Sequence, residues 1–256
     1  MLSVISPAKR LDWSERAVEM TEPQFAEEAL RLAKTMRNLT LGDLRGLMDL
    51  SDDLARLNRD RFRAYDAAPA KDHLRPAVLA FAGDTYQGLE AWTFDPGQMA
   101  RAQQRLRILS GLYGVLRPLD GIQPYRLEMG SRLRTRRGTN LYDFWRDTPA
   151  KALRAQAEEL GTDTLVNCAS QEYFGAVQVK KLGLRVITPV FLEGEGTGAK
   201  TISFFAKRAR GALAGWLIRN DVTRAGDIAG FDVDGYRHDA DASAPDAPVF
   251  RRPRQG

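Results

Sequence analysis

Arginine and lysine side chains gather in two segments of this chain, and their density suits the binding of phosphate. The segment 126–137 holds five arginines and a single acid, Glu128. The segment 200–219 holds five lysines and arginines and no acid. Because guanidinium groups make paired hydrogen bonds to phosphate oxygens, such clusters indicate a polyanionic ligand. The candidate phosphate contacts in these clusters are Arg126, Arg132, Arg134, Lys207, Arg208 and Arg210.

A glycine-rich turn lies just before the first cluster, where Gly111 and Gly114 flank a Leu-Tyr pair. A helix over 99–109, a hairpin over 110–114 and a second helix from Val115 would form a helix-hairpin-helix, whose N–H groups and helix dipole favour an anion. The glycines of such a hairpin are usually two residues apart, and here they are three apart. A purely structural helix-turn-helix corner is therefore the alternative.

The side chains around this turn have two interpretations as well. Ser110 and Arg117 are candidate phosphate contacts at the two ends of the turn. Tyr113 either stacks on an exposed base or packs the corner.

Two further cationic positions follow expected strands. The residues 207–210 begin a helix that we expect directly after a strand over 201–204. Cations at a helix N-terminus oppose the macrodipole, so their presence hints at a bound anion, although a solvated helix end is the plainer explanation. Lys9 follows a buried strand over 2–5 and is interpreted as an anion contact, with a solvated charge or a catalytic amine as the alternatives.

Acids and hydroxyls also occur in the conspicuous motifs. They are Asp84, Tyr86, Glu128, Ser170, Glu172 and Tyr173. A carboxylate pair beside a lysine or serine can perform acid–base chemistry on a nucleoside. More often such groups form ion pairs with neighbouring arginines and brace the fold, and Glu128 beside Arg126 is the clearest example.

Metal and redox chemistry have little support. The chain contains two histidines and one cysteine, with no spacing suited to iron or zinc, so we expect no metal and no cofactor. The single cysteine excludes an internal disulfide. Cys168 follows a strand-like T-L-V-N and is expected to be buried, whereas a peroxide-sensing thiol needs exposure and a lowered pKa.

The elements that must position these groups alternate between strands and helices. Strands are expected over 2–5, 77–81, 164–167 and 185–191, and helices over 23–36, after Thr40, after Ser51, over 140–160 and over 206–219. The pattern predicts a mixed α/β fold with a twisted sheet flanked by helices. No linker separates two cores, so residues 1–256 are read as one domain, with 239–248 as a mobile Ala/Asp/Pro-rich segment.

Composition excludes several classes of protein. With 43% hydrophobic and 28% charged residues the chain has the composition of a globular protein. There is no apolar run of 18 residues and no signal peptide, so we expect no membrane association and a cytoplasmic location. The net charge of +5 is modest, and its clustering matters more than its size.

A series of motifs then runs in order from Met1 to about Arg251. They are S-P-A-K (6–9), F-A-G-D-T-Y-Q-G-L (81–89), L-S-G-L-Y-G-V-L-R-P-L-D-G-I-Q-P-Y-R-L-E-M-G (109–130), N-L-Y-D-F-W (140–145), N-C-A-S-Q-E-Y-F (167–174), P-V-F (189–191), I-S-F-F-A-K-R-A-R-G (202–211) and G-F-D-V-D-G-Y (230–236). In these motifs the chain resembles the YaaA family of bacterial peroxide-stress-resistance proteins. It departs from the family pattern at Arg10, where Thr is expected, and at Cys168, where Leu is expected.

The resemblance implies tolerance of hydrogen peroxide and a low level of unincorporated intracellular iron. It also implies a compact α/β unit of its own type, with a basic cleft and a helix-hairpin-helix-like element that bind DNA. No reaction is firmly attached to the family.

The resulting prediction is a monomeric DNA-binding protein of the peroxide stress response. It would contact phosphates of duplex or distorted duplex DNA with little sequence specificity. The predicted contacts are Lys9, Ser110, Gly111, Tyr113, Gly114, Arg117, Arg126, Arg132, Arg134, Lys207, Arg208 and Arg210.

An enzyme acting on a nucleotide or damaged base is the alternative, and an iron-storing protein has the least support. Convergence of Lys9, Asp84, Glu128 and Ser170 in one pocket would favour the enzyme, and an open groove lined by arginine would favour binding alone.

Overall fold

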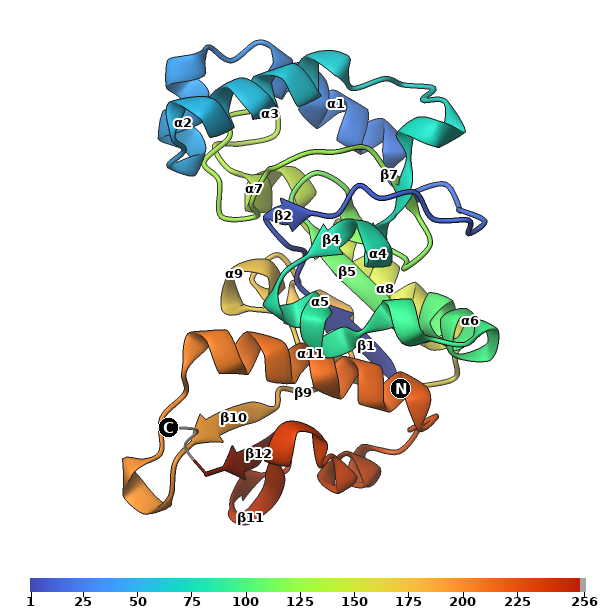
Figure 1. Cartoon of the computed structure of the whole chain (residues 1–256), viewed down its shortest axis with the longest axis vertical. Coiled ribbons are helices and arrows are strands. Elements are labelled where there is room, and N and C mark those ends of the chain that lie inside the picture. The colour runs from blue at the N-terminus through green and yellow to red at the C-terminus, as the bar shows by residue number, and fades with distance from the viewer. Residues whose placement is uncertain (254–256) are drawn as a thin grey trace.

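A five-stranded sheet forms the centre of the molecule in this computed structural model, which describes residues 1–253 (Figure 1). Its strands are β1 (Leu2–Ile5), β5 (Leu106–Ser110), β6 (Gly114–Leu116), β8 (Thr164–Asn167) and β9 (Arg185–Ile187). They lie in the order β6-β5-β1-β8-β9. Four of them are parallel, and only β6 runs antiparallel to its neighbour. All residues of β1, β5 and β8 are buried, as expected of parallel strands covered on both faces.

The chain adds strands to this sheet in two directions from β1. It first places β5 on one side, with Ile5 opposite Ile108, and later places β8 on the other side, with Val4 opposite Asn167. The loops that follow β1 and β8 therefore leave the same edge of the sheet at the point where the strand order reverses. In open α/β sheets this is the position at which ligands bind.

Helices and short ladders surround this sheet. The helices are α1 (Ala26–Arg37), α2 (Leu41–Met48), α3 (Asp52–Ala64), α4 (Ala77–Ala80), α5 (Asp84–Leu89), α6 (Pro96–Arg105), α7 (Leu141–Trp145), α8 (Thr148–Glu159), α9 (Gln171–Phe174), α10 (Val179–Leu182) and α11 (Ser203–Arg219). Short 3-10 turns span Lys71–His73, Ala91–Thr93, Gly196–Gly198, Ala225–Gly230 and Val233–Gly235. Two-residue strands pair β2 (Arg10–Leu11) with β4 (Phe81–Ala82) and β3 (Arg75–Pro76) with β7 (Gly121–Ile122).

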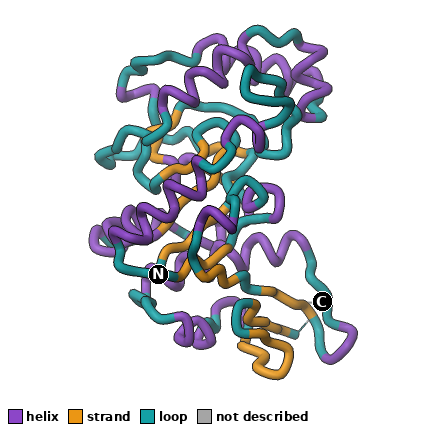
Figure 2. Tube along the Cα trace, turned by 180° about the vertical axis from the view of Figure 1, so that it is seen from behind, coloured by secondary structure: helices purple, strands orange, loops and turns teal. Residues whose placement is uncertain are grey.

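The helical layer expected near the N-terminus is present. Helices α1, α2 and α3 pack together at one end of the molecule, which contains only helices and loops when seen from behind (Figures 1 and 2). Thr40 caps α2 in a capping box with Asp43, and the Ser51 hydroxyl accepts from the Leu54 amide at the start of α3. The sequence located both caps because Ser and Thr stand directly before an apolar periodic run.

A second, three-stranded sheet closes the opposite end of the molecule (Figure 1). It consists of β10 (Val190–Glu193), β11 (Arg237–Ala244) and β12 (Ala247–Arg252), in the order β10-β12-β11. Its buried ion pair joins Arg252 Nε to both Glu193 carboxylate oxygens, each at 2.9 Å, and the Tyr236 hydroxyl donates to Glu193. The segment 239–248, expected to be mobile, lies in the hairpin of β11 and β12.

The expected helix-hairpin-helix over 99–115 is wrong. Helix α6 ends at Arg105, and the residues that follow form the β-hairpin of β5 and β6. The run L-R-I-L-S is short, apolar and fully buried, so its periodicity did not distinguish a central strand from the end of a helix. Arg107, which the helix expected over 99–109 would contain, lies buried in β5 with its guanidinium donating to the Gln103 and Leu106 carbonyls.

Three other expected strands are also different. Residues 77–80 form the single turn of α4, and the extended segment is limited to β4. Residues 201–202 are irregular, and α11 begins at Ser203. The strands expected over 2–5 and 164–167 are confirmed. The single strand expected over 185–191 is divided between β9, in the central sheet, and β10, in the second sheet.

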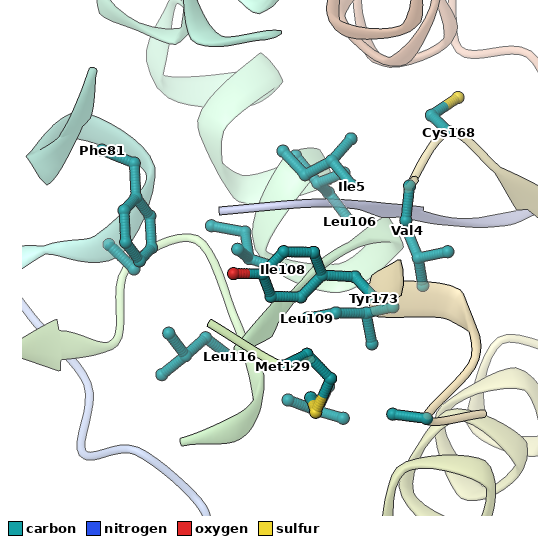
Figure 3. Packing of buried hydrophobic residues seen from close by; sticks show 14 of the residues in the cluster. Val4, Ile5, Phe81, Leu106, Ile108, Leu109, Leu116, Met129, Cys168 and Tyr173 are labelled. Atoms are coloured by element: carbon teal, nitrogen blue, oxygen red, sulfur yellow. The ribbon is translucent and has the colours of Figure 1, made fainter. Parts of the chain in front are cut away.

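The core of the central unit is rich in aromatic side chains. Figure 3 shows the Tyr173 ring among Ile108, Leu109 and Met129, with Cys168 beside Val4. Tyr173 comes from the short helix after β8, so its burial fixes that helix against the sheet.

Helices α5 and α11 touch through their backbones. A Cβ atom on Gly88 would lie 2.0 Å from the Arg208 carbonyl oxygen, and one on Gly211 would lie 1.7 Å from the Thr85 carbonyl oxygen. Both distances are far below any possible carbon–oxygen contact. The two glycines therefore allow α11 to lie directly against α5.

We predict that Gly211→Val lowers the free energy of unfolding by about 2–3 kcal/mol or more, because the added carbons force the two helices apart. Urea denaturation measures the change. Gly46→Ala is the matched control, since a Cβ at this position meets nothing within 4 Å. Because the change also replaces a glycine inside a helix, the free energy of unfolding should hold or rise by about 0.5–1 kcal/mol. Wild-type stability in Gly211→Val would contradict the close contact.

Candidate functional site

A pocket of about 530 Å³ opens at the carboxyl edge of the central sheet. Five segments line it: residues 6–10 after β1, 82–87 at the start of α5, 125–128, 168–173 after β8, and two cations of α11. The volume lies in the usual range for small-molecule sites, roughly 300–1,000 Å³. Segments from five parts of the chain thus converge at the point where the strand order reverses.

Two serines tie the loops after β1 and β8 together. The Ser170 amide donates to Ser6 Oγ at 2.9 Å, and Ser6 Oγ lies 3.3 Å from Ser170 Oγ. The buried Tyr86 hydroxyl donates to the Ser6 carbonyl at 3.1 Å. Ser170 also caps α9 through the Tyr173 amide. These bonds give the floor of the pocket a fixed backbone.

Glu128 holds two of the cations in the pocket. Lys9 Nζ lies 2.9 Å from Glu128 Oε2, and Arg126 Nη2 lies 3.2 Å from Glu128 Oε1. Both carboxylate oxygens of Glu128 are therefore engaged. The trio of Lys9, Arg126 and Glu128 has a net charge of one positive unit. The bracing interpretation of Glu128 from the sequence is confirmed. Lys9 remains 63% exposed at its side chain, so it is still accessible to a ligand.

Four charged groups of the pocket have no ion pair or side-chain hydrogen bond with residues 1–253: Arg10, Asp84, Lys207 and Arg210. Arg10 is exposed. Asp84 is half-buried at the start of α5. Lys207 is exposed and Arg210 is half-buried, both on α11. These are the groups that a ligand can engage without breaking an internal contact.

A third carboxylate, Glu172, is half engaged. Its Oε1 accepts from the Gly130 amide at 2.8 Å, while the Tyr142 hydroxyl donates to its backbone carbonyl. Its second carboxylate oxygen has no partner within the described part of the chain. Glu172 therefore joins the loop at Gly130 to the pocket wall.

Buried tyrosines form the apolar part of the wall. Burial raises the pKa of Tyr125 and holds that of Tyr173 well above its usual value, so both hydroxyls stay neutral. The Tyr125 hydroxyl lies 2.6 Å from Ser110 Oγ. These rings supply flat, uncharged surface next to the charged groups.

The structure brings some predicted cations together and separates others. Lys9, Arg126, Lys207 and Arg210 line the pocket. Arg208 lies outside it and pairs with Asp234 at 3.1 Å. Arg132 and Arg134 are exposed and do not line the pocket.

Arg117 has a structural partner. Its side chain pairs with Asp120 at 2.9 Å, and the Asp120 carboxylate is fully buried. Arg117 also donates to the Glu22 carbonyl. Its guanidinium is thus largely committed to bracing the turn after β6.

The turn residues Ser110, Gly111, Tyr113 and Gly114 are buried. Tyr113 is 2% exposed, and its hydroxyl lies 3.0 Å from that of Tyr65 and accepts from the Gln123 amide. Gly114 has φ +69°, and a Cβ there would lie 2.7 Å from the Trp145 ring. Tyr113 therefore packs the corner in this structure, and its amide donates to Ser110 Oγ at 2.9 Å.

The four residues named as a test of convergence do meet. Lys9, Asp84, Glu128 and Ser170 all line this pocket. Sequence reasoning missed Ser6, Arg10, Gln87 and Tyr125 as lining residues. Ser6 stood in a conspicuous S-P-A-K motif, but its contact with Ser170 depends on β1 and β8 being neighbours, which no local pattern reveals.

Cys168 lines the pocket but is 2% exposed. Burial raises the pKa of its thiol to about 12, against a smaller opposing effect of the positive charge of Arg210. At neutral pH the group is a thiol, and it has little nucleophilic character.

Within residues 1–253, no three His, Cys, Asp or Glu side chains are grouped so as to hold a metal ion. In the same part of the chain, no helix combines the length and apolar character needed to cross a bilayer.

Comparison with known proteins gives consistent similarities over the whole length. Residues 1–242 match the family model described as peroxide stress protein YaaA. The UPF0246 protein of Ruegeria pomeroyi is 67% identical over 256 residues, covering 100% of both chains. The UPF0246 protein of Roseobacter denitrificans is 65% identical over 255 residues, covering 99% of this chain and 98% of the relative. That of Caulobacter vibrioides is 49% identical over 256 residues, covering 99% of this chain and all of the relative.

We predict that Cys168 in the folded protein reacts very slowly with a thiol reagent such as Ellman's reagent. With a pKa of about 12, on the order of one thiol in 10⁵ is ionised at pH 7, and burial blocks access. Absorbance of the released thiolate measures the rate. In guanidinium chloride the same residue should react at the rate of a free cysteine, and full reaction within minutes in the native protein would contradict the burial.

Proposed function

Since the chain belongs to the peroxide stress protein YaaA family, we propose that it serves the peroxide stress response by binding DNA. The binding surface is the mouth of the pocket, with the phosphate contacts made by Lys9, Arg126, Lys207 and Arg210. The exposed Arg132 and Arg134 extend this surface along the backbone of the nucleic acid. Arg208 and Arg117 are left out because Asp234 and Asp120 engage them.

The observation that carries this proposal is the excess of cations around one pocket. Five lysines and arginines and three carboxylates line it. Lys207 and Arg210 are not neutralised by any carboxylate of residues 1–253. Uncompensated like charges on one helix face cost stability in the free protein, and a bound polyanion removes that cost. Phosphate contacts of this kind favour affinity over sequence readout.

We predict that the protein binds duplex and bubbled DNA with an affinity that falls steeply with salt, log K dropping by roughly 0.9 per neutralised phosphate for each tenfold rise in salt. Replacing Lys207 and Arg210 together by Ala should weaken binding several-fold and flatten the salt slope. The thermal unfolding temperature without DNA should hold or rise, because a like-charge repulsion is removed. Fluorescence anisotropy over a salt series and thermal denaturation measure both effects.

Arg154→Ala is the control for total charge, since Arg154 pairs with Glu158 on α8 and does not line the pocket. It should leave the affinity nearly unchanged. Absence of binding to both DNA forms at low salt would contradict the proposal. A large loss of stability with unchanged affinity in the double variant would assign Lys207 and Arg210 to the fold.

A second candidate is an enzyme acting on a nucleotide or damaged base in the same pocket. It is favoured by the meeting of Lys9, Asp84, Glu128 and Ser170, which supply an amine, two carboxylates and a hydroxyl. Of these, Asp84 is the free carboxylate suited to accept a proton from water or substrate, because Glu128 is engaged by two cations.

For this candidate we predict that mass spectrometry detects a changed product when the protein is incubated with oligonucleotides carrying 8-oxoguanine or with free nucleotides. Asp84→Asn should abolish the change without altering the circular dichroism spectrum, because the side chain makes no internal bond within residues 1–253. Unchanged masses for every substrate would leave binding alone as the function.

A further inference from the structure

We propose that the pocket takes a single nucleotide unit. Its phosphate lies against Lys207 and Arg210, and the N–H edge of its base lies against Asp84. The proposal rests on the nucleic-acid binding inferred above and specifies which part of the nucleic acid enters the protein.

The size of the pocket limits the ligand to one nucleotide. Its volume of about 530 Å³ suits a single base with its sugar and phosphate. A B-form duplex, whose major groove alone is about 12 Å wide, remains outside such a site. The duplex can rest on the mouth, but only an isolated nucleotide can reach the floor near Ser6 and Ser170.

The free charges of the pocket have opposite signs. Lys207 and Arg210 are three residues apart on α11 and share a helix face, so both can contact one phosphate group. Arg210 is half-buried, which limits its exposure to solvent and strengthens a paired hydrogen bond to phosphate oxygens. A phosphate held here satisfies both of these α11 cations at once.

Asp84 indicates that the ligand contains hydrogen-bond donors in addition to a phosphate. A free carboxylate repels phosphate and would weaken a site devoted to the nucleic-acid backbone. It is a good acceptor for N–H groups, as carboxylates are in paired contacts with two parallel donors. Guanine offers two adjacent donors, N1–H and its amino group, whereas thymine offers one. Asp84 therefore favours guanine, including oxidised guanine that retains this edge.

The fold fixes the spacing between the two ends of the proposed site. Asp84 is the first residue of α5, and Lys207 and Arg210 lie on α11 beside it. Gly88 and Gly211 bring these helices into backbone contact. Neither helix can move away without losing that contact, so the carboxylate and the cations are presented at a constant separation. Tyr125, Leu127 and Pro7 supply the uncharged wall between them for the sugar and the base.

The nucleotide can come from two sources with the same chemistry. One is a free mononucleotide. The other is a nucleotide turned out of a strand, for which unstacking costs a few kcal/mol and is cheapest at a mismatch or damaged base. The two sources are distinguished by comparing mononucleotides with duplexes that do or do not contain an unpaired guanine.

Isothermal titration calorimetry at low salt tests the site directly, with dGMP, deoxyguanosine, dTMP and deoxyribose 5-phosphate as probes. We expect dGMP to bind most tightly, since it alone combines a phosphate with two adjacent donors for Asp84. Loss of the paired contact at either end of the site should weaken the binding of dGMP roughly tenfold or more. Lys207→Ala with Arg210→Ala should reduce dGMP binding to the level of deoxyguanosine.

The variant Asp84→Asn separates the base contact from the phosphate contact. It should remove the preference for dGMP over dTMP, while the affinity for deoxyribose 5-phosphate should hold or rise because a charge that repels phosphate is removed. Arg208→Ala is the matched control, because Arg208 is on the same helix but outside the pocket and pairs with Asp234. It should change none of these affinities. Equal binding of dGMP and dTMP by the wild-type protein, or an unchanged preference in Asp84→Asn, would overturn the proposal.

Anisotropy with DNA separates failure of this site from failure of DNA binding. Tighter binding to a duplex with one unpaired guanine than to the paired duplex, lost in Asp84→Asn, supports a nucleotide from the strand. Binding of dGMP without any DNA binding supports a free nucleotide and contradicts the DNA proposal only. Binding of both duplexes equally, with no binding of dGMP, overturns the pocket proposal and leaves DNA binding intact.

Discussion

The pairing of β1 on both of its sides is the constraint on which the site depends. β1 is hydrogen-bonded to β5 on one side and to β8 on the other, and all three run in the same direction. Parallel neighbours deliver their following loops to one edge, so residues 6–10 and 168–173 meet although more than half the chain separates them. The bond from the Ser170 amide to Ser6 Oγ then fixes one loop against the other. Without this pairing, Lys9 and Glu172 would belong to different surfaces.

Local features of the sequence allowed part of this structure to be predicted. Thr40 and Ser51 marked helix starts because capping is decided by a few neighbouring residues. The strands β1 and β8 were found because each is a short apolar run bounded by a turn.

The strand β5 was not predicted, since L-R-I-L-S follows a helix without a break and contains Arg107. Its guanidinium is buried and satisfied by carbonyl oxygens, and burial lowers its pKa to about 10, so it remains charged at neutral pH. The burial of Arg107 and the contact of its guanidinium with the Gln156 side chain depend on the tertiary fold.

The site residues were predictable by type but not by partner. Density of charge singled out Arg126, Lys207 and Arg210, and position after a strand singled out Lys9; these four converge. Density of charge also singled out Arg208, and position at the turn singled out Arg117, but Asp234 and Asp120 engage them. The glycines of the turn were noticed for the right reason, since Gly114 has a positive φ and no room for a side chain. Their assignment to phosphate binding did not follow, because the turn faces Trp145 and the Tyr65–Tyr113 pair. Only the packing around a residue distinguishes a glycine needed for a ligand from one needed for the core.

The balance between paired and free charges explains how one pocket can both attract and orient a ligand. In the trio of Lys9, Arg126 and Glu128 every group has an ion-pair partner, so the trio keeps its geometry without a ligand, and its net positive charge attracts anions from solution. Asp84, Lys207 and Arg210 are uncompensated within residues 1–253 and sit on two helices held in backbone contact. Because the helices are already fixed, binding orders few additional atoms, and the contacts formed by the free groups are retained as affinity.

The neutral, buried tyrosines of the pocket keep water away from one wall, which strengthens the contacts between a ligand and the free charged groups. The glycine contact between α5 and α11 is therefore part of the binding site, although neither Gly88 nor Gly211 lines the pocket.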